Sequence, residues 1–154
     1  MEINSMLAQQ LDALLTDEHN NVANMANASA LLMQELENVS WAGFYTYVDD
    51  KNELILGPFQ GKVACVHIPV GNGVCGTSFK ENKTIRVEDV NQFPGHIACD
   101  SNSKSEIVIP ISKDGISFGV LDIDAPILNR FSEDDQKLLE EFIKVFENHI
   151  TIDN

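Results

Sequence analysis

The fold is decided by one stretch of the sequence, EIVIPISKDGISFGVLDID, which spans residues 106–124. Two of its runs, 106–111 and 116–124, have the apolar pattern of β-strands. Between them, Lys113-Asp-Gly115 is typical of a hairpin turn, because Asp and Gly tolerate the positive φ angles that such turns need. The stretch therefore predicts two neighbouring antiparallel strands.

Around this hairpin, the apolar residues have helical spacing near both ends of the chain and a period of two between them. The change of period begins at Trp41. Near the C-terminus, Ser132-Glu-Asp-Asp135 is a capping-box variant that opens a last helix reaching about His149. The other predicted elements are helices at 7–15, 22–36 and 74–81 and strands at 41–48, 53–56, 63–69 and 84–87.

Length and composition fit one domain over residues 1–154. Apolar residues make up 44 % of the chain and charged residues 22 %, which are ordinary values for a globular protein. No linker or repeat divides the sequence. The order of elements predicts an α+β fold, with a central, mostly antiparallel sheet and the N-terminal and C-terminal helices packed mainly on one face.

The chain is strongly acidic, with a net charge of −14 from 10 Lys and Arg against 24 Asp and Glu. A field of this sign repels phosphate backbones and anionic lipids, so we expect neither a nucleic-acid nor a membrane partner. Residues 1–15 lack the basic start of a signal peptide, and no apolar run approaches the roughly 18–20 residues that span a bilayer. We expect a cytoplasmic protein.

Three cysteines stand out, Cys65, Cys75 and Cys99. An odd number in a cytosolic chain argues against a purely structural set of disulfides. Three buried thiols that act as small apolar side chains are the plain alternative. Cys99 fits that alternative least, because it lies in a polar stretch without periodicity, 91–104, that has the composition of a working loop. Cys65 is expected on the strand 63–69.

Three carboxyl groups are expected to converge on one face of the predicted sheet. Asp122 and Asp124 are two residues apart on a strand and therefore share a face. Glu106 begins the neighbouring strand of the hairpin. Three carboxyls in one pocket cannot all ionise cheaply, so at least one should have a raised pKa and stay protonated. The alternative is that the two aspartates only end a strand before the turn at Ala125-Pro126.

Two aromatic residues, Trp41 and Tyr45, are spaced four apart on a predicted strand and so share a face as well. Rings pack well against sulfur and methyl groups, which would make them suitable walls for a thioether ligand. A plain core position for Trp41 is the alternative.

Six passages of the sequence carry a family resemblance. They are Trp41-Ala-Gly-Phe-Tyr45, Gly57-Pro-Phe-Gln-Gly61, Gly73-Val-Cys-Gly76, Phe93-Pro-Gly-His-Ile-Ala-Cys-Asp100, Ser105-Glu-Ile-Val-Ile-Pro110 and Leu121-Asp-Ile-Asp124. With the order of elements, they resemble a GAF domain. More specifically, the chain resembles the free methionine-(R)-sulfoxide reductases over essentially its full length.

The resemblance implies an oxidoreductase that reduces free L-methionine-(R)-sulfoxide and not the sulfoxide within proteins. It implies that Cys99 attacks the substrate, that Cys65 resolves the product as a disulfide, and that thioredoxin, ultimately supplied by NADPH, restores the dithiol. Cys75 would be able to join this disulfide chemistry. No bound cofactor and no metal are implied.

The chemistry also requires an acid, because the departing oxygen must be protonated. We expect Glu106 and Asp124 to hold or protonate the sulfoxide oxygen, and Asp122 to orient the site or bind the substrate's ammonium group. Acidic surroundings raise the pKa of a thiol. Either a protonated His96 offsets this for Cys99, or the sulfoxide takes its proton before the thiol attacks, and the sequence leaves both orders open.

Other functions remain alternatives at this point. The chain could be a ligand-sensing module without chemistry of its own. It could hold zinc through Cys65, Cys75 and Cys99 with His67 or His96, although close-spaced ligand pairs such as C-x-x-C are absent. It could act on methionine sulfoxide in peptides, if its pocket were an open groove. The apolar faces of the N-terminal helices would allow a homodimer.

Overall fold

The computed structural model describes residues 1–95 and 102–152. Its centre is an antiparallel sheet with the strand order β3-β2-β1-β6-β5-β4. The strands are β1 (Trp41–Val48), β2 (Glu53–Gln60), β3 (His67–Pro69), β4 (Ile85–Val87), β5 (Ser105–Lys113) and β6 (Ile116–Ala125). The helices are α1 (Met6–Leu15), α2 (Asn21–Glu35), α3 (Gly73–Glu81) and α4 (Glu133–Glu147), with short 3-10 turns at Asp49–Lys51 and Val90–Gln92.

The hairpin predicted from residues 106–124 is confirmed as β5 and β6 at the middle of this sheet. Its turn residues Asp114 and Gly115 have φ angles of 53° and 80°. Such positive angles let a two-residue turn match the twist of the strands. The capping box of α4 is also confirmed, because the Ser132 hydroxyl accepts from the Asp135 amide and the Asp135 carboxylate accepts from the Ser132 amide.

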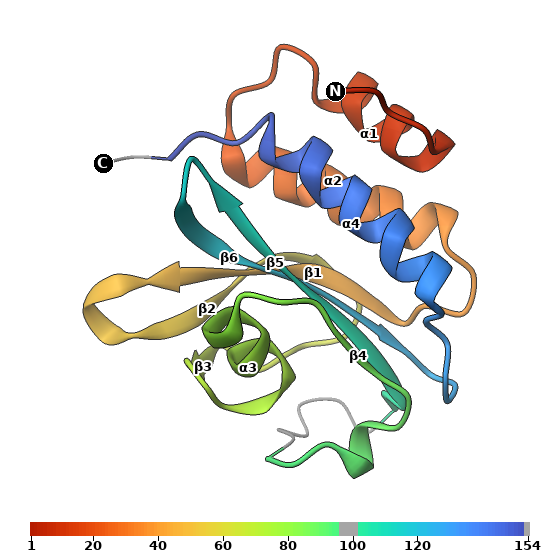
Figure 1. The fold of residues 1–154 in the computed structure, drawn as a ribbon, viewed down its shortest axis with the longest axis vertical. Helices are drawn as coiled ribbons and strands as arrows, with labels where there is room; N and C mark the ends of the chain where they lie inside the picture. Colours follow the sequence, from red (N-terminus) through yellow and green to blue (C-terminus); the bar gives the residue numbers. More distant parts are fainter. Residues whose placement is uncertain (96–101, 153–154) are drawn as a thin grey trace.

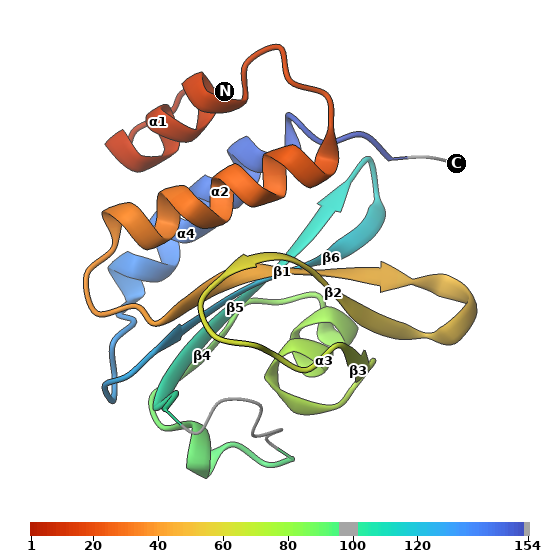
Figure 2. The same ribbon diagram turned by 180° about the vertical axis from the view of Figure 1, so that it is seen from behind.

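Helices α1, α2 and α4 lie on one side of the sheet and α3 lies on the other (Figures 1 and 2). Helices α2 and α4 contact the strands, and α1 packs on α2 and α4 as an outer layer. The predicted arrangement, with terminal helices mainly on one face, is therefore confirmed. None of the helices in the described part of the chain has the length and apolarity that a membrane crossing needs.

The sheet separates two apolar cores, because successive side chains of a strand point to opposite faces. On the side of the three helices, Phe44 of β1 stacks on Phe146 of α4 with ring centroids 4.8 Å apart. The opposite face carries a smaller cluster that includes Trp41, Tyr45 and, from α3, Cys75. Those predicted site residues that the structure describes lie on this second face.

The predicted strand 63–69 is wrong over residues 63–66, because β3 begins only at His67. Residues 61–66, which we call the strap, cross the face of the sheet that carries the smaller apolar cluster. They do not pair as a strand. Two side chains of β1 donate hydrogen bonds to backbone carbonyls of the strap. Trp41 Nε1 donates to the Lys62 carbonyl at 3.0 Å, and the Tyr45 hydroxyl donates to the Cys65 carbonyl at 3.0 Å. Cys65 therefore lies on an irregular segment tied down by side chains. Strand β2 is in turn longer than predicted and reaches Gln60.

Candidate active site

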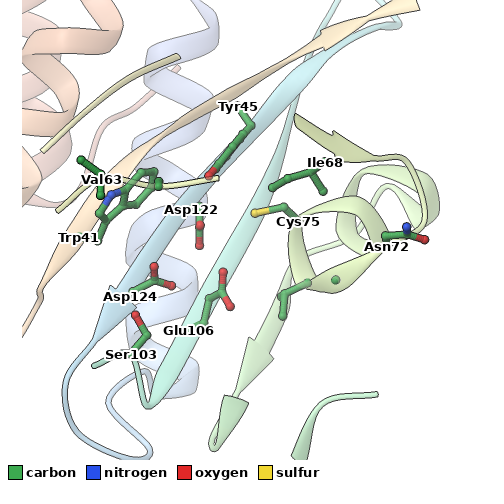
Figure 3. A pocket seen from close by; sticks show the side chains of 13 residues that line it. Trp41, Tyr45, Val63, Ile68, Asn72, Cys75, Ser103, Glu106, Asp122 and Asp124 are labelled. Carbon is green, nitrogen blue, oxygen red and sulfur yellow. The ribbon is translucent and has the colours of Figure 1, made fainter. Parts of the chain in front are cut away.

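The sheet register brings the three acidic residues together. Glu106 of β5 lies directly opposite Asp124 of β6, and Asp124 lies directly opposite Trp41 of β1. Asp122 occupies the next position along the same face of β6. Figure 3 shows the three carboxyl groups pointing into one space between the sheet and α3. The convergence expected from the spacing in the sequence is thus present in the structure.

This space is a cavity with a volume of about 60 Å³. Among the residues that the structure describes, its lining comes mainly from the face of the sheet, the strap and the start of α3 (Figure 3). The lining residues are Trp41, Tyr45, Glu106, Asp122 and Asp124 from the sheet, Val63 and Ala64 from the strap, Asn72, Gly73, Val74 and Cys75 from the start of α3, and Ile68 and Ser103.

Burial dominates the electrostatics of this cavity. The Glu106 side chain is nearly inaccessible to water, and this desolvation, together with the negative charges of Asp122 and Asp124, raises the pKa of Glu106 well above its ordinary value. Hydrogen bonds within the carboxyl cluster act in the same direction. The shift favours the protonated form of Glu106, which makes this residue the candidate carboxylic acid of the cavity.

Cys75 is a free, buried thiol in the first turn of α3, and its sulfur points toward Asp122 (Figure 3). Burial raises the pKa of Cys75 well above its ordinary value, and the charges of Asp122, Glu106 and Asp124 and a hydrogen bond with Asp122 add to the shift. A helix N-terminus favours a thiolate, but here desolvation and the acidic neighbours outweigh it. Cys75 is therefore a protonated, poorly nucleophilic thiol in this state.

The predicted cysteines differ in state and position. Cys65 lies half-buried on the strap and is disulfide-bonded. Cys99 and His96 lie outside the described residues. The proposed zinc ligand His67 is exposed, and its Nδ1 atom is 2.9 Å from the Glu53 carboxylate, so it does not face Cys75 or the acidic cluster. In the described part of the chain, the side chains close enough to share a metal ion are Cys75, Glu106 and Asp122.

The two aromatic residues form the wall next to the strap. Trp41 and Tyr45 are 2 % and 3 % exposed, and their ring centroids lie 6.0 Å apart at 25°. Phe59 of β2 also stacks on Trp41, with ring centroids 5.1 Å apart at 17°. Gly43 permits this arrangement, because a Cβ atom there would lie 2.3 Å from Phe59 Cβ and 2.9 Å from the Trp41 ring.

The sequence did not reveal several of these contributors. Phe59 and Gly43 support Trp41, although both lie within passages that carry the family resemblance. The start of α3 and Ser103 join the cavity only through contacts between distant parts of the chain. The signal that could have pointed to α3 is Gly73 in the sequence Gly71-Asn-Gly73, whose φ of 63° allows the tight entry into the helix.

Comparisons with known proteins match nearly the whole chain. A family model of the GAF domain matches residues 19–150. Protein YtsP of Bacillus subtilis (strain 168) is 56 % identical over 142 residues, which cover 92 % of this chain and 87 % of that protein. The free methionine-R-sulfoxide reductase of Escherichia coli (strain K12) is 48 % identical over 141 residues, which cover 92 % of this chain and 84 % of that protein. A solved structure of fRMsr of Staphylococcus aureus, in its reduced form, is 53 % identical and superposes with a TM-score of 0.90, covering 97 % of this chain and 98 % of that one.

The raised pKa of Glu106 makes a prediction for stability. Above a pH of about 4.5, unfolded Glu106 loses its proton while the native residue keeps it, so the free energy of unfolding falls as pH rises toward the native pKa. The Glu106→Gln variant has no titratable group at this position. Its free energy of unfolding should therefore rise relative to that of the wild type by up to about 1.4 kcal/mol per pH unit in that window. Urea unfolding of both disulfide-bonded proteins between about pH 5 and 8 measures the difference. Two parallel stability curves would show that Glu106 ionises normally.

Proposed function

This chain belongs to the GAF-domain family of free methionine-R-sulfoxide reductases, and we propose that it reduces free L-methionine-(R)-sulfoxide to L-methionine. One observation carries the proposal: a buried carboxyl with a raised pKa, two further carboxyl groups and an aromatic wall meet in one cavity beside a strap that holds a disulfide-bonded cysteine. Such a set supplies an acid, a binding pocket and a redox-active sulfur.

We propose that two electrons come from cysteine thiols. The Cys99 thiol attacks the sulfoxide sulfur, the oxygen passes to Cys99 as a sulfenic acid, and methionine leaves. The Cys65 thiol then attacks the sulfenic acid, so that an S–S bond forms, the S–O bond breaks and water departs with the thiol proton. A dithiol protein of the thioredoxin type, itself reduced by NADPH, exchanges with the disulfide and is oxidised in its place.

The states of the described cysteines support this division of roles. Cys65 is disulfide-bonded, which is the state expected of a resolving residue after a turnover. Cys75 is free and buried, and its protonated thiol faces Asp122. We therefore assign Cys75 to the wall of the substrate cavity in the oxidised enzyme, with its thiol available to the disulfide chemistry only after it has left Asp122.

The protonated Glu106 supports one of the two orders of proton transfer. A sulfoxide oxygen that receives a proton makes its sulfur more electrophilic, so a neutral or weakly ionised thiol can attack it. Glu106 and its neighbour Asp124 are placed to share and deliver that proton. We therefore propose that protonation by this pair precedes the attack of Cys99.

The remaining groups of the cavity suit the rest of the substrate. The rings of Trp41 and Tyr45 offer a surface for the S-methyl end, because polarizable sulfur and methyl groups pack well on aromatic rings. The Asp122 carboxyl, which also lines the cavity, is the group that we propose to bind the ammonium group of the substrate. The enclosing strap and the small room inside favour a free amino acid over a residue within a polypeptide.

The direct test supplies the protein with each epimer of free methionine sulfoxide, thioredoxin, thioredoxin reductase and NADPH, and follows NADPH consumption. We expect turnover with the R epimer and essentially none with the S epimer. Cys99→Ser should abolish turnover, also with dithiothreitol as the reductant. Cys65→Ser should release about one methionine per protein and then stop, because the sulfenic acid has lost its resolving thiol.

Full activity of Cys99→Ser with dithiothreitol would remove Cys99 from the reaction. Binding of the sulfoxide without any NADPH consumption by the wild type would favour a ligand-sensing module. Stoichiometric zinc in the purified protein, with a matching loss of free thiols, would favour the metal site instead.

The carboxyl groups make a separate prediction. Glu106→Gln and Asp124→Asn should each lower the rate of methionine release by roughly 10²–10⁴-fold if the pair supplies the proton. Asp114→Asn is the matched control, because it changes a carboxyl on the same hairpin at the exposed turn, where Asn tolerates the φ of 53°. Losses below threefold in both variants would exclude the pair as the acid.

A further inference from the structure

The strap, residues 61–66, accepts hydrogen bonds from two side chains of the substrate cavity. It lies outside the sheet ladders. Its far end is tied to β2, where the Leu56 amide donates to the Val66 carbonyl at 2.9 Å. Between its ends, the carbonyls of Lys62 and Cys65 accept the hydrogen bonds of Trp41 and Tyr45.

Of these two donors, the Tyr45 hydroxyl is the one that binds the backbone of Cys65. It donates to the Cys65 carbonyl at 3.0 Å, while the ring of the same side chain lines the cavity and stacks on Trp41. Desolvation, followed by the charge of Asp122, raises the pKa of Tyr45 above its ordinary value, so the hydroxyl remains a donor at any working pH. Tyr45 is 3 % exposed and sits on a central strand, which makes it a rigid support.

We propose that the Tyr45 hydroxyl is a positioning group for Cys65. It holds the strap in an orientation in which the Cys65 thiol reacts rapidly with the sulfenic acid. This inference rests on the proposed function, because it assigns a role within the second step. In that step the Cys65 sulfur displaces the hydroxyl from the oxidised cysteine, an S–S bond replaces the S–O bond, and water leaves. Tyr45 takes no part in the electron transfer, and its effect comes from the orientation of the backbone that carries the thiol.

A positioning role of the Tyr45 hydroxyl would change the rate of the resolving step relative to the rate of substrate reduction. A general loss of structure would slow both steps together. Removing the hydroxyl keeps the ring that lines the cavity, and released methionine, measured in the same sample, reports any effect on the reduction of the substrate. The Cys65 carbonyl loses its side-chain donor, and the strap gains freedom just where the resolving thiol is attached. The lifetime of the sulfenic acid should therefore increase relative to the rate at which it forms.

The test is a competition within a single turnover. Reduced Tyr45→Phe receives free methionine-(R)-sulfoxide and a fixed concentration of dimedone, which traps sulfenic acids, without thioredoxin. Mass spectrometry gives the ratio of dimedone adduct to disulfide, and released methionine reports the first step in the same sample. We expect the ratio to rise about tenfold over wild type, which is the change that the loss of one hydrogen bond of ordinary net strength produces.

Tyr47→Phe is the matched control. It removes a phenol from the same strand, but the Tyr47 hydroxyl contacts Asp49 and Asn52 and not the strap. Its adduct ratio should equal that of the wild type. The inference is overturned if Tyr45→Phe keeps the wild-type ratio, including the case in which methionine release alone is slowed. Failure of the wild type to release methionine would contradict the proposed function itself. This outcome is measured on the wild type alone and is therefore distinct from the comparison of variants.

A second variant keeps the test valid if Tyr45→Phe does not fold. Gly61 begins the strap with a φ of +132°, and a Cβ there would lie 2.6 Å from Trp41 Cδ1 and 2.9 Å from the Ser40 carbonyl. Trp41 is buried and stacks on both Tyr45 and Phe59, so we expect the exposed start of the strap to move instead. Gly61→Ala should therefore also raise the adduct ratio, and an unchanged ratio would contradict a role for strap position.

Discussion

Buried carboxyl groups that share one cavity cannot all carry a charge, and the chemistry of this site depends on that constraint. Glu106 lines the cavity with two acidic neighbours, and burial together with their charges raises its pKa and favours its protonated form. The same surroundings keep Cys75 a thiol. The cavity is therefore poised to give a proton and is poorly suited to generate a thiolate. A sulfoxide, whose oxygen must be protonated as it leaves, is a substrate class that benefits from this combination.

The fold keeps this arrangement rigid by using the two faces of one sheet differently. The helix-covered face is filled by large apolar side chains, which fix the central strands β1, β5 and β6. On the other face, those strands present acidic and aromatic side chains at adjacent register positions. The strap, which carries Cys65, is tied to the same strands by Trp41 and Tyr45. The aromatic wall of the cavity and the disulfide-bonded Cys65 thus share one support.

Periodicity and turn chemistry predicted the parts of this site that depend on neighbours in sequence. A spacing of two placed Asp122 and Asp124 on one face, and the turn at Lys113-Asp-Gly115 brought Glu106 beside them. The position of Cys65 could not be predicted this way: the apolar run 63–69 favours a strand, but side-chain donors 20 residues or more away in the sequence hold the backbone out of the ladder. The contact of α3 with the cavity likewise depends on tertiary packing that no local pattern encodes.

The central claim is that Glu106 is a carboxylic acid at neutral pH. Difference infrared spectroscopy between the wild type and Glu106→Gln observes that proton directly, through the C=O stretching band of a protonated carboxyl and its shift in heavy water. The account predicts such a band in the wild type at pH 7 and its loss in the variant. A difference spectrum at pH 7 that contains only carboxylate bands would contradict it.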